Sequence, residues 1–240
     1  LAQLLTATGR PDAALEILRG RRFQPWEGGE GQVLSAWDEA LLALGRAALD
    51  LGDAAGAVAH VEQALAPVPG LGEARHLLAN CAHLQLLLGD ARAAAGDDDG
   101  ANRAWSAAAS SAGDFQGMAP VAFSDMTYYS VLASRRLGDT AREQTLVAGL
   151  EDHARELHRT RAAVDYFATS LPTMLLFEDD LDAAQTTTAM LLDAQVLALR
   201  GDPEAGRALV DEVLERDPNR LRALGLRREL SITPVGGSSR

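Results

Sequence analysis

The sequence predicts an all-α fold, a solenoid built from helical hairpins. Three observations lead to this expectation. The 240 residues include 45 alanines and 38 leucines, which lose little side-chain freedom in a helix. Aromatic residues make up only 5% of the chain. A short turn signal, a glycine followed by Asp or by Arg-Pro-Asp, recurs along the chain, and each copy joins two helical patterns.

The turn signals divide the chain into hairpins. In each turn, the glycine ends the first helix in the left-handed conformation, and Asp or Pro opens the second. The spacings between the turn glycines are 43, 44, 42 and 63 residues. Because the last spacing is about one and a half units, we expect an extra helix or helix pair between residues 153 and 178. The turns lie at Gly9, Gly52, Gly96, Gly138 and Gly201.

Two further expectations concern the helices. Residues 31–51 and 71–95 are predicted to be nearly continuous helices, which accounts for the length of the repeat. The acidic runs Asp97–Asp99 and Glu178–Asp180 are predicted to begin helices, where carboxylates accept hydrogen bonds from free N–H groups and favour the helix dipole.

Small residues recur around the turns in a fixed pattern. The clearest copy comprises Leu44, Gly45, Ala48, Ala57, Val61, Ala64 and Pro69. Further copies are Leu88, Gly89, Arg92, Ala101, Trp105 and Ala108; Leu197, Gly206, Val210, Val213 and Pro218; and, in part, Leu5, Ala14 and Leu18. The copy at Gly138 is poor, because Glu143 stands where a small residue is expected.

This pattern resembles the tetratricopeptide repeat (TPR), in which small residues let two helices approach closely. The resemblance implies a right-handed TPR-like solenoid over residues 1–230, with irregular repeats of about 43 residues. Residues 231–240 are expected to form a flexible C-terminal tail.

Three stretches, residues 23–31, 71–80 and 165–172, are similar to the C-terminal TPR region of large bacterial proteins. Those proteins carry a β-rich N-terminal domain of unknown function. Because the chain starts at Leu1 within an expected helix, we interpret it as a fragment of a longer protein. The resemblance implies that the N-terminal domain of the parent chain is one candidate partner.

Charge and cysteine content exclude several functions. The formal net charge is −12, from 34 acidic and 22 basic residues, and this argues against nucleic acid as a partner. The sequence has no apolar run near 18 residues and no signal peptide, so we expect no membrane contact and a cytoplasmic location. The single cysteine, Cys81, is expected to be a small buried hydrophobe in a helical stretch.

The first candidate binding site is a loop. Trp26, Glu27 and Glu30 lie in a glycine-rich segment in which the Trp side chain could stack on a sugar ring or hold a peptide. The alternative is a linker whose Trp fills the core. Arg75 and His76 share a predicted helical surface with Asn80, where they would bind a ligand or satisfy a neighbouring loop.

The second candidate site is the concave groove of the solenoid, which the first helix of each hairpin lines. Counting back from Gly138, we place Asp125, Tyr128, Arg135 and Arg136 on this face. Two arginines and a tyrosine suit a carboxylate-bearing peptide. The alternative is that the arginines lie in the last turn of their helix, where cations are favoured by the dipole.

The sequence shows no catalytic set and no metal site. His76 and His83 are seven residues apart and His153 and His158 are five apart, whereas a helical metal pair needs four. We therefore expect no cofactor. The predicted function is a non-catalytic scaffold for protein–protein or interdomain interaction. The alternatives are an accessory domain of a carbohydrate-active enzyme and a ligand-sensing repeat domain of a transcription regulator.

Overall fold

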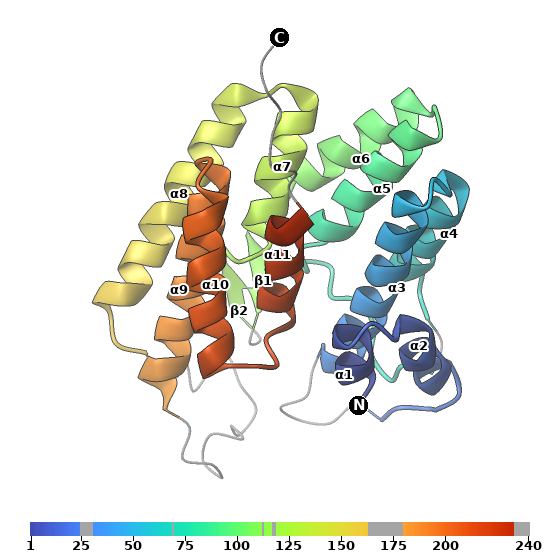
Figure 1. Ribbon diagram of the computed structural model, residues 1–240, viewed down its shortest axis with the longest axis horizontal. Helices are drawn as coiled ribbons and strands as arrows, with labels where there is room; N and C mark the ends of the chain where they lie inside the picture. The colour runs from blue at the N-terminus through green and yellow to red at the C-terminus, as the bar shows by residue number, and fades with distance from the viewer. Residues whose placement is uncertain (25–30, 69, 112, 117–118, 163–179, 233–240) are drawn as a thin grey trace. The chain divides into compact units, whose positions relative to one another are not determined.

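The computed structural model describes residues 1–24, 31–68, 70–111, 113–116, 119–162 and 180–232 (Figure 1). These residues form eleven helices and one small sheet. The helices are α1 (Ala2–Ala7), α2 (Pro11–Arg19), α3 (Gln32–Asp50), α4 (Ala54–Leu65), α5 (Ala82–Ala94), α6 (Asp98–Ser110), α7 (Thr127–Leu137), α8 (Thr140–Arg159), α9 (Leu181–Leu199), α10 (Pro203–Arg216) and α11 (Leu221–Ile232). The strands β1 (Asp114–Gln116) and β2 (Ala119–Val121) pair antiparallel. The all-α class predicted from the sequence is confirmed.

All five predicted turns join two consecutive helices. Their glycines have φ angles of 80°, 79°, 80°, 71° and 88°, the left-handed conformation that a helix end requires. Four of the helices that follow begin with carboxylate caps. Asp53, Asp97, Asp139 and Asp202 each accept a hydrogen bond from the N–H three residues later, at 2.8–3.0 Å. Helix α2 begins instead with Arg10 and Pro11, without a side-chain cap. Asp180 caps α9 in the same way, as predicted.

The described residues fall into two compact units. The first comprises residues 1–146, and the second comprises residues 147–162 and 180–232. Helix α8 begins in the first unit and continues into the second. None of the helices among these residues is long and apolar enough to cross a membrane.

In the first unit, each helix from α1 to α7 packs against the next one in sequence. Figure 1 shows α3 beside α4 and α5 beside α6. The first helices of successive hairpins also pack together, so that α1 contacts α3, α3 contacts α5 and α5 contacts α7.

Several small residues of the repeat pattern lie in close contact with a neighbouring helix. A Cβ atom on Gly89 of α5 would lie 2.3 Å from Cδ1 of Trp105 on α6, so the indole ring occupies the space above the glycine. A Cβ on Gly45 would lie 3.2–3.3 Å from Leu87 and Val61. Five small or β-branched residues of the repeat pattern on α4 and α6 are fully buried, namely Ala57, Val61, Ala64, Ala101 and Ala108. These positions therefore have the packing role that the sequence predicts for them.

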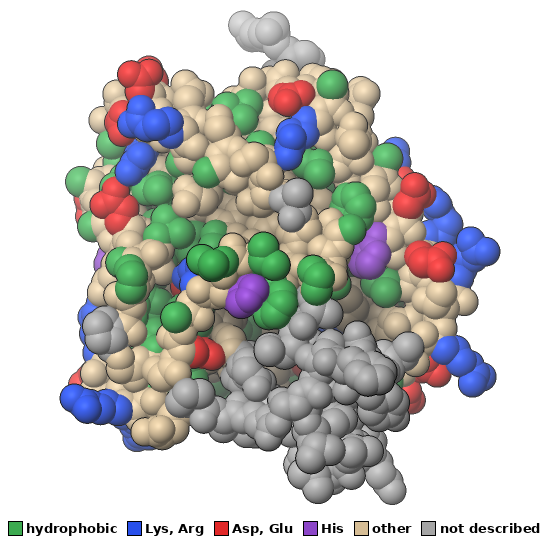
Figure 2. Space-filling view, turned by 180° about the vertical axis from the view of Figure 1, so that it is seen from behind, with side chains coloured by type: hydrophobic (Ala, Val, Ile, Leu, Met, Phe, Trp, Pro, Cys, Tyr) green, Lys and Arg blue, Asp and Glu red, His purple; other side chains and the backbone are tan. Residues whose placement is uncertain are grey.

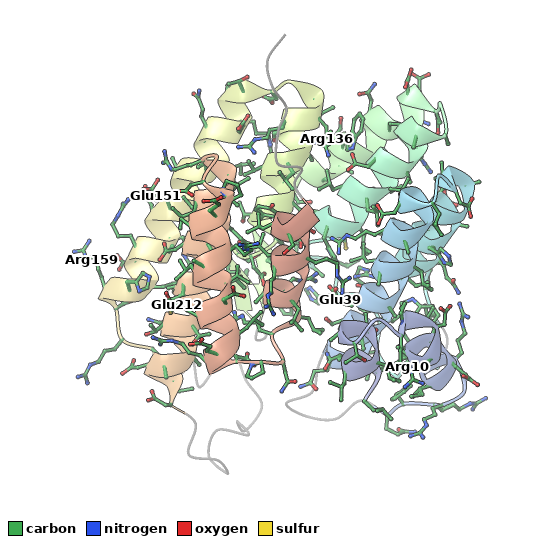
Figure 3. All side chains as sticks on the ribbon, viewed as in Figure 1. Arg10, Glu39, Arg136, Glu151, Arg159 and Glu212 are labelled. Carbon is green, nitrogen blue, oxygen red and sulfur yellow. The ribbon has the colours of Figure 1, made fainter. Side chains whose placement is uncertain are left out.

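The second unit is built around α9, which packs against α10 and α11. Gly206 of α10 brings the two backbones together, since a Cβ there would lie 2.9 Å from the Ala194 carbonyl oxygen. On α8, Glu151 accepts a hydrogen bond from Arg200 at the end of α9 (Figure 3 labels Glu151). The Nε2 atom of His158 on α8 lies 2.7 Å from Oδ2 of Asp193 on α9.

Three expectations need correction or fall partly outside the described residues. Residues 71–81 are not helical. Helix α5 begins at Ala82, and Cys81 is its N-cap residue rather than part of the helix. The predicted helix over 31–51 is confirmed as α3. Helix α8 continues to Arg159 and covers the start of the region 153–178, of which residues 163–179 lie outside the described part. Helix α11 extends through Ile232, and positions 233–240 of the expected tail are not described.

Candidate functional site

The predicted groove residues lie around α7, but they do not form one open surface. Asp125 precedes the helix and is half-buried. Tyr128 is only 6% exposed, and its ring packs edge-on against Tyr129 at a centroid distance of 5.3 Å. The binding role of this face stays a prediction.

Both groove arginines form ion pairs within the first unit. Arg135 donates from Nε to Glu143 Oε1 at 2.7 Å. Arg136, labelled in Figure 3 at the end of α7, donates from Nε and Nη2 to the two carboxylate oxygens of Asp90 at 2.9 and 3.2 Å. Asp90 also accepts from the Trp105 indole at 3.0 Å. Because these pairs are partly exposed, each contributes little to stability.

Trp26, Glu27 and Glu30 of the predicted loop site lie outside the described residues. Arg75 and His76 lie in the segment of residues 71–81, which we call the leucine loop. This loop connects α4 to α5 and was predicted to be helical. Gly72 adopts a conformation that no helix contains: its φ is 78°, and a Cβ there would lie 2.4 Å from the Phe23 carbonyl oxygen.

Glu73 fixes the leucine loop to the start of α3. Its Oε1 accepts from the Leu34 N–H and its Oε2 from the Gly31 N–H, both at 2.6 Å. The N-cap residue of α3 is Gly31, which has no side chain to perform this role. A carboxylate from a distant part of the chain therefore satisfies the free N–H groups of the helix and meets the positive end of its dipole.

Arg75 fixes the loop to the middle of α3. Its two terminal nitrogens each donate to one oxygen of the Asp38 carboxylate at 2.8 Å, and Nη2 also donates to the Ala64 carbonyl oxygen at 3.0 Å. Burial alone would lower the pKa of Arg75, but its hydrogen bonds and charge pairing with Asp38 outweigh burial and raise it. Arg75 is therefore held as a fixed cation and is engaged within the chain.

Asn80 and Asp114 join the end of the loop to the β1–β2 hairpin. Asn80 donates from Nδ2 to the Gly113 carbonyl oxygen at 2.8 Å, and its Oδ1 accepts from the Ala82 N–H at the start of α5. The buried Asp114 carboxylate accepts from the N–H groups of Asn80 and Phe115 and from the Ser124 hydroxyl, at 2.8–3.1 Å. Both ends of the leucine loop are thus tied to the helical framework.

Between these anchors, the loop presents two leucines to solvent. Leu77 is 99% exposed and Leu78 is 61% exposed. They line a pocket of about 300 Å³ whose other lining residues are Ala79, Asn80, Ser111, Gly113, Asp114, Pro120 and Val121. The His76 ring stacks on Phe115 beside it, with centroids 3.8 Å apart. Figure 2 shows hydrophobic side chains and a histidine gathered on one face of the molecule.

The β1–β2 hairpin is a poor template for a further strand. Phe115 lies opposite Pro120, which has no N–H to donate to a further strand. The Phe115 N–H donates to the Asp114 side chain at 2.8 Å. One edge of the hairpin therefore lacks a donor, and on the other edge a donor is already engaged.

The histidines and the cysteine lie apart in the described part of the chain. His83 is buried in α5, whereas His76 is exposed in the leucine loop, so the two do not lie on one helix. Burial raises the pKa of the Cys81 thiol, against the opposing effect of Arg75. The described residues include no group of three His, Cys, Asp or Glu side chains that could hold a metal ion.

No protein-family model matches this sequence, and no solved structure matches it significantly. The candidate site therefore rests on the geometry of this chain. Sequence reasoning identified Arg75 and His76 but not Glu73, Leu77, Leu78 or Asp114. One signal was available: Pro67, Pro69 and Gly70 directly before the loop, and Gly72 within it, are residues that interrupt helices.

Proposed function

We propose that this chain is a non-catalytic, TPR-like scaffold that holds a protein, a peptide or another domain of its own parent chain. The observation that carries the proposal is the packing of α1, α3, α5 and α7, the first helices of successive hairpins, against one another. Stacked hairpins in this order leave an extended surface lined by the first helices, and repeat proteins use such surfaces for binding.

The repeat pattern supports the same proposal. Gly45 and Gly89 occupy equivalent places in two successive hairpins, and each lies under a larger side chain of the second helix. The turns at Gly9, Gly52, Gly96 and Gly138 are separated by 42–44 residues. We infer a right-handed solenoid in which the long connections between hairpins, including the leucine loop and the β1–β2 hairpin, account for the excess over a plain repeat.

Two surfaces are candidates for the bound partner. The first is the face around Asp125, Tyr128, Arg135 and Arg136. Its two arginines would break their ion pairs within the chain and bind carboxylates of the partner instead. The second is the leucine loop, which presents apolar surface on a rigidly held backbone. Large exposed apolar side chains in a group are typical of interaction sites.

A peptide library displayed on phage tests the scaffold function. We expect the folded chain to select peptides with a shared sequence pattern, and the urea-unfolded chain to select none. Replacement of both Arg135 and Arg136 by Ala separates the two surfaces. If the α7 face holds the partner, this variant weakens binding at least about tenfold and costs little stability, since both ion pairs are partly exposed.

The absence of any selected pattern would contradict the scaffold function. Turnover of a glycoside or ester panel would contradict the non-catalytic part, provided that a single Ser or carboxylate substitution abolishes it.

A further inference from the structure

We propose that the pocket beside Leu77 and Leu78 binds a short peptide segment that inserts one apolar side chain next to an arginine or lysine. This inference rests on the proposed scaffold function and names the site and the chemistry of its ligand. Four features of the described residues carry it: the exposed leucines, the anchoring of the loop on both sides, the charge of the pocket and the lack of free donors on the strand edges.

The exposed leucines are held in place rather than free to fold inward. Arg75 lies two residues before Leu77 and is bonded to Asp38 and the Ala64 carbonyl, and Asn80 lies two residues after Leu78 and is bonded to Gly113. A loop anchored on both sides loses little conformational freedom when a ligand binds. The backbone therefore keeps the two leucines at the rim of the pocket without a partner.

The size of the site favours a short segment over a second copy of the chain. The pocket volume of about 300 Å³ lies at the lower end of the range for ligand sites, which suits one or two side chains. Even an aromatic side chain buries only about 150–250 Å². The surface that two leucines can bury is therefore well under the roughly 800 Å² that each partner buries in a stable interface.

The charge of the site favours a cation beside the inserted apolar group. Among the described residues that line the pocket, the only formal charge is the carboxylate of Asp114. The chain as a whole has a net charge of −12. Arg and Lys also have aliphatic stems that can lie along Leu77 and Leu78 while their charged ends stay in water.

The blocked strand edges exclude one common way of binding a peptide. Addition of a strand to β1–β2 would need free backbone donors, but Pro120 has none and Phe115 donates to Asp114. Recognition therefore depends on the inserted side chain and its charged neighbour. Selectivity should follow these two side chains rather than the peptide backbone.

The test is a ¹H–¹⁵N NMR titration of the whole chain with three synthetic peptides. The first is acetyl-Ser-Leu-Arg-Arg-Ser-amide, the second replaces both arginines by glutamate, and the third replaces leucine by alanine. We expect the first to shift the amide signals of Leu77, Leu78, Asn80 and Asp114. The other two should bind at least about tenfold more weakly.

A matched pair of variants locates the site. Leu77→Ser combined with Leu78→Ser should weaken binding of the first peptide at least about tenfold. Leu51→Ser removes a leucine that is 86% exposed at a hairpin turn and should leave binding unchanged.

Several outcomes would overturn this inference: equal binding of the arginine and glutamate peptides, signal shifts confined to other residues, or no binding. A dimer seen by analytical ultracentrifugation and lost in the Leu77/Leu78 variant would instead identify an interface between two copies. If library peptides bind the wild-type chain and the Leu77/Leu78 variant equally well, the scaffold function stands and only this site is wrong.

Discussion

The guanidinium of Arg75 and the carboxylate of Asp38 form two parallel hydrogen bonds of 2.8 Å each, although the residues are 37 positions apart in the sequence. Asp38 lies on α3 and its side chain is only 5% exposed. A buried carboxylate has given up much of its hydration, and the guanidinium of Arg75 offsets this cost with two charge-assisted hydrogen bonds. This pair therefore holds the leucine loop against the helical framework.

Replacement of Arg75 by Ala should destabilise the chain by about 2–4 kcal/mol, because it leaves Asp38 as a buried charge without the guanidinium. Arg75→Lys should recover only part of this loss, since a lysine cannot form the two parallel bonds. Urea unfolding followed by circular dichroism measures both. Arg103→Ala, at an exposed position on α6, is the control. Equal stability of the Arg75→Ala and Arg103→Ala variants would contradict a structural role for the pair.

Replacement of Glu73 by Ala should cost about 1 kcal/mol, as for the loss of a helix N-cap, because the N–H groups of Gly31 and Leu34 lose their acceptor. The effect should be local. Hydrogen exchange should become faster in the first turn of α3 and stay unchanged in the last turn of that helix. Glu73→Gln keeps one side-chain oxygen as an acceptor and should give an intermediate result. Uniformly faster exchange along α3 would argue against capping.

Substitution of Leu for Ala57 or Ala101 should overpack a hairpin and cost about 1–3 kcal/mol, since both alanines are fully buried. The matched controls are Ala59→Leu on α4 and Ala107→Leu on α6, which place the same side chain at exposed positions. The melting temperature of each variant is the measurement. If the buried and exposed substitutions had the same effect, the assignment of the repeat positions would be wrong.

Stability should fall between neutral and mildly acidic pH in part because of His153. Burial lowers the pKa of this histidine below its ordinary value of 6.5, since it disfavours the charged ring. Between the two pKa values the unfolded chain binds more protons, so the free energy of unfolding rises with pH in this window. The stability associated with the uncharged His153 ring is fully present above about pH 6.5, and it is lost as the pH falls through the pKa of this ring in the folded state.

His153→Gln should therefore lose less stability than the wild-type chain between pH 7.5 and pH 5. Urea midpoints at the two pH values give the comparison, and an NMR titration of the His153 ring gives its pKa directly. A ring that titrates at or above its ordinary value would contradict this prediction.

Local sequence features are sufficient to predict the helical hairpins. Each hairpin depends on interactions between residues a few positions apart. These residues are the glycines at five turns, the carboxylates that follow them and small residues such as Ala57 and Ala101. Helix propensity, capping and hairpin packing depend on residues close in sequence, so their pattern can be interpreted without coordinates. The same holds for the cap at Asp180.

The tertiary structure alone decided the leucine loop and the state of the groove arginines. Residues 71–81 have an apolar pattern suited to a helix, but Glu73 and Arg75 bond to α3 across 39 and 37 residues, and these bonds hold the loop in another conformation. Arg136 forms an ion pair with Asp90, which is 46 positions away in the sequence, so a side chain predicted to face a ligand is bound within the chain. Buried polar groups must find partners wherever the fold brings them together, and a one-dimensional pattern does not specify which distant residues these are.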